Sequence, residues 1–206
     1  MSGLRLVLAR HGQTDANIRL VLDSRPPGPP LTELGHRQAE ELADELAVEP
    51  VVGVYASTAV RAQQTAAPVA ARHGLAVEIV DGLHEVFLGD LEGTVGPEPV
   101  ERFHVVLRAW QAGDLDRPVP GGESATQAID RFTAAIAGIE RRHAHGVIVA
   151  VTHGAIVEVA VPRLATNLLA FDQRPLMPNA GQIVLDRDDT ASTGWRCVAW
   201  PGLPIS

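Results

Sequence analysis

An apolar strand that ends in a cation, an imidazole and a glycine constrains this chain more than any other single feature. The run Leu4–Leu8 is interrupted only by Arg5. After Ala9, the chain continues as Arg10-His11-Gly12. In an open α/β sheet, ligands bind at the carboxyl ends of the strands, and a glycine lets the backbone approach a ligand closely. The tripeptide therefore suits a phosphate group, although a structural histidine in a βα turn fits the same residues.

A second strand ends in the same way far along the chain. The β-branched run VIVAVT, residues 147–152, leads directly into His153 and Gly154. Core packing requires apolar side chains at the ends of buried strands. Two imidazoles in equivalent positions therefore favour a functional site, and we expect them to converge on one ligand.

Strand-like and helix-like segments alternate along the rest of the chain, which is the pattern of an α/β sandwich. We expect strands at 4–8, 51–56, 77–80, 147–152, 182–186 and 195–200, and helices at 31–46, 58–72, 124–142 and from residue 155. The polar turn 187–194 predicts a hairpin. The expected fold is a three-layer α/β/α sandwich with a mostly parallel sheet and an antiparallel edge strand, in a single domain over residues 1–206.

Composition excludes several classes of protein. The net charge of -8 argues against a general nucleic-acid binder, and no apolar run approaches the roughly 20 residues that span a bilayer. All 17 basic side chains are arginines, so a P-loop lysine and a Schiff-base lysine are absent. The amino terminus lacks the layout of a signal peptide, and the single cysteine, Cys197, fits a reducing compartment. We therefore expect a cytoplasmic protein.

Two irregular segments are expected to lie at the mouth of the site. Prolines and a glycine forbid regular structure in the loop Arg19–Pro30. Residues 94–113 include a helical stretch with Phe103 and Trp110 on one side. This stripe predicts a cap over the pocket, within a region of about 94–122, although core packing of the same side chains fits equally well.

These pieces occur in the order found in the histidine phosphatase superfamily, also called the phosphoglycerate mutase-like family, which the chain resembles. The matching segments are Arg10–Gly12, Ser57 with Arg61 and Thr65, His84–Gly93, Pro120–Ser124 and Thr152–Gly154. Together they span most of the chain. The resemblance implies a phosphoglycerate mutase-like fold and a metal-independent phosphatase of small phosphate monoesters that needs no cofactor.

The resemblance also implies the roles of individual residues. His11 would attack phosphorus and form a phosphohistidine, and Glu85 would supply and accept the proton. Arg10, Arg61 and His153 would stabilise the phosphoryl oxygens. Further contacts to the substrate are expected from Gly12, Asn17 and Gly154.

Elementary chemistry agrees with a nucleophilic His11. Neighbouring cations keep an imidazole neutral by lowering its pKa, and a hydrogen bond from Nδ1 to a backbone carbonyl would leave Nε2 free to attack. Arg61 stands in the first turn of the helix 58–72, where the helix dipole disfavours a cation. Without the resemblance a surface arginine explains Arg61 better; with it, we interpret the side chain as held there for an anion.

The remaining polar residues near these motifs have simpler interpretations. Ser57 or Thr58 is expected to cap the helix 58–72, and Ser124 with Gln127 matches a capping box. We interpret Glu92 and Glu123 as supporting residues and His84 as a loop or surface imidazole. The pair His143 and His145 fits solvated positions at a helix end better than a metal site.

Two other functions remain open. A phosphoglycerate mutase would return the phosphoryl group to a related acceptor. The family's glycolytic mutases carry a longer insertion with a lysine and paired arginines, whereas the interval Gly93–Pro120 is short and has neither, which favours a phosphatase. A catalytically silent phospholigand-binding protein would lack the nucleophile or the acid, and both His11 and Glu85 are present. The sequence names neither the monoester nor the oligomeric state, so a homodimer stays open.

Overall fold

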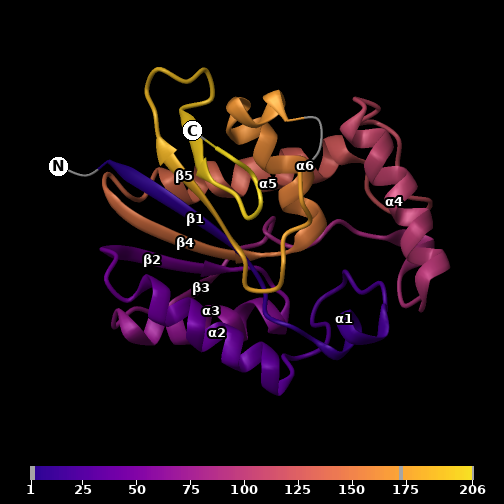
Figure 1. The fold of residues 1–206 in the computed structure, drawn as a ribbon, viewed down its shortest axis with the longest axis horizontal. Coiled ribbons are helices and arrows are strands. Elements are labelled where there is room, and N and C mark those ends of the chain that lie inside the picture. The colour runs from indigo at the N-terminus through magenta and orange to yellow at the C-terminus, as the bar shows by residue number, and fades with distance from the viewer. Residues whose placement is uncertain (1–2, 172–173, 206) are drawn as a thin grey trace.

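A twisted sheet with helices on both faces forms the computed structural model, which describes residues 3–171 and 174–205 (Figure 1). Within these residues the sheet has six strands in the order β3-β2-β4-β1-β5-β6. The strands are β1 (Leu4–Arg10), β2 (Val51–Ala56), β3 (Val77–Ile79), β4 (Gly146–Thr152), β5 (Gln182–Arg187) and β6 (Trp195–Ala199). The first four in this order are parallel, whereas β5 and β6 join by antiparallel pairing. The predicted mostly parallel sheet with an antiparallel edge is confirmed.

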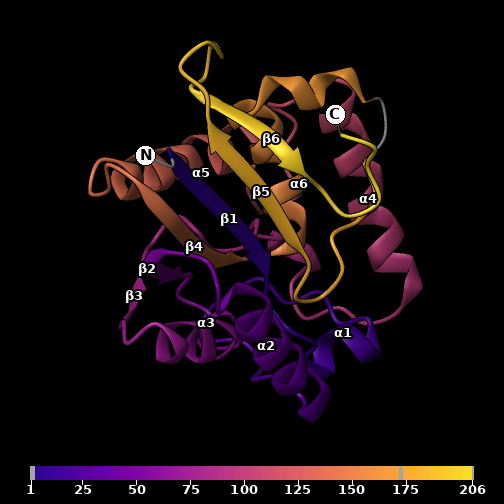
Figure 2. The ribbon, with the colours of Figure 1, turned by 60° about the vertical axis from the view of Figure 1, so that its left-hand side comes forward.

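Helices cover both faces because the central strands are apolar on both sides. In β1, Val7 and Ala9 pack with α2 (Glu33–Leu46) and α3 (Val60–Arg72). Leu6 and Leu8, which alternate with them, pack with α5 (Ala125–Glu140) and α6 (Gly154–Leu164). The two helix layers lie on opposite sides of the sheet in Figures 1 and 2. This arrangement is the expected three-layer sandwich.

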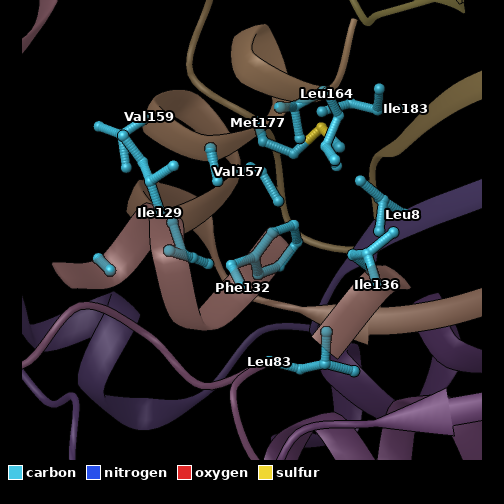
Figure 3. Close-up of a cluster of buried hydrophobic side chains, with 14 of the residues drawn as sticks. Leu8, Leu83, Ile129, Phe132, Ile136, Val157, Val159, Leu164, Met177 and Ile183 are labelled. Carbon is cyan, nitrogen blue, oxygen red and sulfur yellow. The ribbon is translucent and has the colours of Figure 1, made fainter. Parts of the chain in front are cut away.

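The larger apolar cluster joins α5 and α6 to the sheet. Figure 3 shows Phe132 and Ile136 of α5 beside Val157 of α6 and Leu8 of β1. All four side chains are almost completely buried. The cluster fixes where α6 begins, and hence where the chain just after β4 lies.

The region expected as a cap contains the helix α4 (Pro97–Gln111). Its apolar stripe, Phe103, Val106, Leu107 and Trp110, is buried in the same cluster as α5 and α6. The indole of Trp110 donates to the carbonyl of Arg117 at 2.7 Å. Most of the stripe therefore serves core packing.

Several local predictions need adjustment. The expected cap of α3 by Ser57 or Thr58 is wrong: Ala59 precedes the helix, and no side chain caps it. The Ser57 hydroxyl is instead hydrogen-bonded to Nε2 of His153 at 2.7 Å. The short helix α1 (Asp15–Arg19), capped by Thr14, was not expected. Two short 3₁₀ segments, Gly89–Leu91 and Thr166–Ala170, complete the helical elements of the described residues.

Within residues 3–171 and 174–205, none of the helices combines the length and the apolar character needed to cross a membrane.

Two glycines let α2 begin directly against the turn that follows β1. A Cβ atom on Gly12 would lie 2.6 Å from the carbonyl oxygen of Gly35. A Cβ atom on Gly35 would overlap the carbonyl oxygen of Gln13. This close backbone approach supports the segment that carries His11, because neither side of the contact has room for a side chain.

A pair of glycine-to-alanine changes tests this contact. Gly35→Ala should destabilise the protein by about 1–3 kcal/mol, the usual cost of overpacking, although alanine favours helices. Gly138→Ala in α5 is the matched control, because its Cβ would meet only Nη2 of Arg141 at 3.9 Å. It should stabilise by roughly 0.5–1 kcal/mol. Urea unfolding measures both, and a stabilising Gly35→Ala would contradict the contact.

Candidate active site

The two predicted histidines meet at the carboxyl ends of adjacent parallel strands. β1 and β4 pair with Arg10 opposite Thr152, and the amide of His11 donates to the Thr152 carbonyl at 3.0 Å. The rings of His11 and His153 are therefore neighbours, with centroids 5.1 Å apart. Only 4% of His11 and 1% of His153 is exposed. The structure thus brings together two imidazoles that are 142 positions apart in the sequence.

The geometry of His11 selects one tautomer. Its Nδ1 lies 2.7 Å from the carbonyl oxygen of Gly12; because a carbonyl only accepts, Nδ1 carries the proton. Burial, followed by the charges of Arg61 and Arg10, lowers the pKa of His11 well below 6.5, against the opposing effect of the Gly12 hydrogen bond. His11 is therefore a neutral imidazole whose Nε2 has a free lone pair.

His153 is held neutral for similar reasons. Burial is the largest cause that lowers its pKa well below 6.5, and the charges of Arg61 and, to a smaller extent, Arg10 add to it. Its Nε2 is hydrogen-bonded to the hydroxyl of Ser57. Its Nδ1 is buried without a partner among the described residues.

Two arginines flank the imidazoles. Arg10 ends β1, and its Nη1 donates to the carbonyl of Met177 at 2.5 Å. Arg61, in the first turn of α3, is only 3% exposed. Its Nη1 donates to the carboxylate of Asp23 at 2.9 Å and its Nη2 to the Asp23 carbonyl at 3.1 Å. Sequence reasoning missed Asp23; the only available signal was an acidic residue in a loop expected at the pocket mouth.

Glu85 is fixed by backbone groups. Its carboxylate accepts hydrogen bonds from the amides of Ala155 at 3.0 Å and Ile156 at 2.8 Å, both in the first turn of α6. The amide of Val86 is a third donor, at 2.9 Å. The start of α6, immediately after His153, therefore holds Glu85 near both imidazoles.

A partly buried ion pair positions the loop that carries Glu85. Arg131 of α5 donates to the carbonyls of Gly82, His84 and Glu85, at 2.8–2.9 Å. It also forms a two-point ion pair with Glu123. Glu123 in turn accepts from the amide of Phe87 at 2.9 Å. Glu123 thus supports the site through Arg131 rather than touching it.

The three predicted substrate contacts lie in different surroundings. The amide of Gly12 already donates to the hydroxyl of Thr65 at 2.9 Å, so this N–H is occupied. Asn17 lines the pocket, and its side-chain oxygen accepts from Asn179 at 3.1 Å. Gly154 packs against Arg10: a Cβ at this position would lie 3.4 Å from Nε of Arg10.

A pocket of about 140 Å³ is lined by Arg10, His11, Arg61 and Glu85, whereas His153, buried next to His11, is not part of the lining. Its polar lining combines the two arginines and His11 with two carboxyl groups, and its remaining walls are largely apolar. The lining residues are Arg10, His11, Thr14, Ala16, Asn17, Val21, Leu22, Asp23, Arg61, Glu85, Leu88 and Phe103. The described chain thus offers a small cleft that places two guanidinium groups beside the imidazole of His11.

The other candidate histidines and acids lie outside the pocket lining. His84 was predicted to be a loop or surface imidazole. It lies in a loop but not on the surface, because only 6% of it is exposed and its ring stacks on Phe87, with centroids 4.4 Å apart. Glu92 accepts from the amide and hydroxyl of Ser24, as a supporting residue would. His143 is hydrogen-bonded to the hydroxyl of Tyr55 at 2.7 Å. No cluster of three or more potential metal ligands occurs among residues 3–171 and 174–205.

A buried acid on α6 lies close to the site without lining the pocket. Glu158 is 3% exposed and stands one helical turn after Gly154. Burial, with the charge of Glu85, raises its pKa from 4.5 to about 7, against the effects of Arg10 and Arg174. Glu158 therefore loses its proton in the folded protein only near neutral pH.

This raised pKa predicts a specific dependence of stability on pH. Between pH 4.5 and about 7 the folded state binds more protons at Glu158 than the unfolded chain, so its contribution to stability falls as pH rises. The full penalty above pH 7 is roughly 3 kcal/mol. We therefore compare the change in unfolding free energy that Glu158→Gln causes at two pH values. This change should be more stabilising at pH 8 than at pH 5 by about this amount. Urea unfolding at both pH values measures it, and an equal effect at both would contradict the raised pKa.

Comparison with known proteins identifies the family. The chain belongs to the histidine phosphatase superfamily (branch 1), whose profile matches residues 6–201. It is 32% identical over 165 residues to the adenosylcobalamin/alpha-ribazole phosphatase of Escherichia coli K12, covering 78% of this chain and 79% of that protein. The resemblance to this family is thereby confirmed, and its relatives include phosphatases.

Two further similarities extend over nearly the whole chain. The PE-PGRS family protein PE_PGRS11 of Mycobacterium tuberculosis is 32% identical over 213 residues, covering 95% of this chain. This chain spans only 36% of that relative's length. The solved structure of a mycobacterial glucosyl-3-phosphoglycerate phosphatase superposes with a TM-score of 0.79 at 26% identity, covering 95% of this chain and 97% of that chain.

Proposed function

We propose that this chain is a phosphatase that hydrolyses small phosphate monoesters through a phosphohistidine on His11. The observation that carries the proposal is the pair of neutral imidazoles, 5.1 Å apart between ring centroids, beside the buried Arg61 and the partly buried Arg10. Family membership and the phosphatases among the relatives support it. We assign the phosphoryl contacts to Arg10, Arg61 and His153.

Charge explains how the substrate binds. A phosphate monoester carries about -1.5 to -2 charges at neutral pH, and guanidinium groups match its oxygens by paired hydrogen bonds. Arg10 and Arg61 both line the pocket. Because they are fixed before the substrate arrives, they stabilise the charge on the transferring group without reorganisation.

In the first step, Nε2 of His11 attacks phosphorus and the bond to the alcohol oxygen breaks. The electron pair of that bond leaves with the oxygen, and the proton of the Glu85 carboxyl group neutralises it. The ring keeps its proton on Nδ1 and becomes a phosphorylated imidazolium. The hydrogen bond from Nδ1 to the Gly12 carbonyl stabilises this positive charge.

In the second step, water attacks the phosphohistidine. Glu85, now a carboxylate, accepts one proton of the water, and the remaining hydroxide forms the new bond to phosphorus. The electron pair of the P–N bond returns to Nε2, so His11 is again a neutral imidazole. Phosphate leaves and Glu85 carries its proton once more.

We also infer that the region 94–122 acts as a cap. Phe103 of α4 lines the pocket, while the rest of the apolar stripe holds the helix on α5 and α6. The organic part of the substrate would lie against this aromatic ring. A cap of this kind excludes water from the cleft once the substrate is bound.

Removing the nucleophile tests the proposal directly. His11→Ala should lower kcat for p-nitrophenyl phosphate on the order of 10³-fold or more, with an unchanged circular dichroism spectrum. His145→Ala, an exposed histidine, is the control and should keep the wild-type rate. We expect full wild-type turnover in the presence of a chelator.

The same assay separates the alternative functions. Absence of turnover for a broad panel of monoesters would contradict the proposal and favour a phospholigand-binding protein. Transfer of phosphate between positions of a phosphoglycerate that outpaces phosphate release would favour a mutase. A His11→Ala variant that retains a tenth of the rate would remove His11 as the nucleophile.

A leaving-group series tests the role of Glu85. Glu85→Gln should slow poor leaving groups about 10²-fold or more, the usual scale of general acid catalysis, and slow nitrophenyl phosphate much less. The reason is that nitrophenolate leaves without a proton, whereas a sugar alkoxide does not. Measuring kcat/KM for aryl and alkyl phosphates checks this, and equal slowing across the series would exclude Glu85 as the acid.

A further inference from the structure

One acid in the candidate site has no part in the proposed chemistry. Asp23 lines the pocket and pairs with Arg61 at 2.9 Å, and 27% of its side chain is exposed. Its carboxylate is paired with Arg61 and lines the same pocket as His11. Asp23 therefore lies beside the guanidinium group that would hold the phosphoryl group, within reach of the alcohol part of a substrate.

The carboxylate of Asp23 is held in place by its loop. The neighbouring Ser24 donates its amide and its hydroxyl to Glu92, and Ser24 also accepts from the amide of Leu88 at 3.2 Å. The amide of Leu22 donates to the carbonyl of Thr94 at 3.0 Å. Both residues beside Asp23 are thus anchored, so its negative charge is a fixed feature of the pocket.

The remaining lining offers nothing to balance a second anion. Among the described residues that line the pocket, the arginines are Arg10 and Arg61, and both are assigned to the phosphoryl group. The carboxylate of Asp23 adds a negative charge to the one that these two arginines must balance. The other walls are apolar or carry uncharged polar groups.

We infer that Asp23 determines substrate specificity: it disfavours monoesters whose alcohol carries a carboxylate and favours alcohols with uncharged hydroxyl groups. A hydroxyl near the ester donates a hydrogen bond to the Asp23 carboxylate, whereas a carboxylate in the same place is repelled. This inference rests on the proposed function, because the two arginines are committed to a phosphoryl group.

A matched pair of compounds tests this inference. Glycerol 3-phosphate and 3-phosphoglycerate differ chiefly in a terminal hydroxymethyl group in place of a carboxylate. The wild type should favour glycerol 3-phosphate, and Asp23→Asn should shift the ratio of kcat/KM toward 3-phosphoglycerate about tenfold, as expected for a partly screened like-charge pair. The asparagine oxygen still accepts from Arg61, so the arginine stays in place. Asp23→Ser, a second neutral variant, should shift the ratio in the same direction.

The control breaks a comparable ion pair far from the pocket. Asp186→Asn removes the partner of Arg5, which binds it at 2.7 Å on strands β1 and β5, and should leave the ratio unchanged. High salt should reduce the wild-type preference but have little effect on Asp23→Asn. Both results would support a charge effect at residue 23.

Three outcomes distinguish failure of this inference from failure of the proposed function. Equal gains for both compounds would show that Asp23 only competes with phosphate for Arg61, and equal losses would show that it only holds Arg61; either overturns the inference. The third uses dissociation constants from calorimetry. The protein could bind glycerol 3-phosphate and 3-phosphoglycerate with the expected ratio of dissociation constants, dependent on Asp23, and yet hydrolyse no monoester. This result would refute the proposed phosphatase activity and support the inferred selectivity.

Discussion

Parallel pairing between β1 and β4 is the constraint on which the rest of the site depends. It places Arg10 beside Thr152 and thereby brings His11 and His153 into ring contact. The register is fixed because alternate residues of β1 face different helix layers. A slip of one residue would turn Leu8 toward the wrong layer and would separate the two imidazoles at the same time. The core therefore specifies the geometry of the site.

Burial then sets the chemistry of these side chains. Desolvation disfavours a charged imidazole, and two neighbouring arginines add to the effect, so both histidines are neutral. The start of α6 links this pair to the acid, because the helix that follows His153 also donates two amides to Glu85. The proposed nucleophile and the proposed acid are thus positioned by the same strand-to-helix transition. The packing of α6 on α5 holds that transition in place.

The sequence predicted the parts of the fold that depend on local pattern, and missed those that depend on long-range contacts. Strand ends followed by His-Gly could be recognised because polar residues interrupt apolar runs there. The capping role of Ser57 was wrong because His153, distant in sequence, binds its hydroxyl. His84 is buried because Arg131, distant in sequence, donates hydrogen bonds to the carbonyls of its loop and holds the loop against α5. Asp23 was missed because its pairing with Arg61 depends on the path of an irregular loop, which no periodicity encodes.

In the proposed function, residues at the strand ends carry out the chemistry, and a residue in a loop sets the selectivity. His11, His153 and Arg10 are placed by the sheet and its helices, whereas Asp23 is placed by contacts between two loops. The amides of Gly93 and Gly96 donate to the carbonyls of Leu22 and Leu20, and both glycines have positive φ, 72° and 102°. Side chains at these positions would strain the backbone and displace the loop that carries Asp23. If Asp23 selects the alcohol as inferred, changes in the segment that leads into α4 would alter which alcohol is accepted, while the strand ends would keep the proposed phosphoryl chemistry intact.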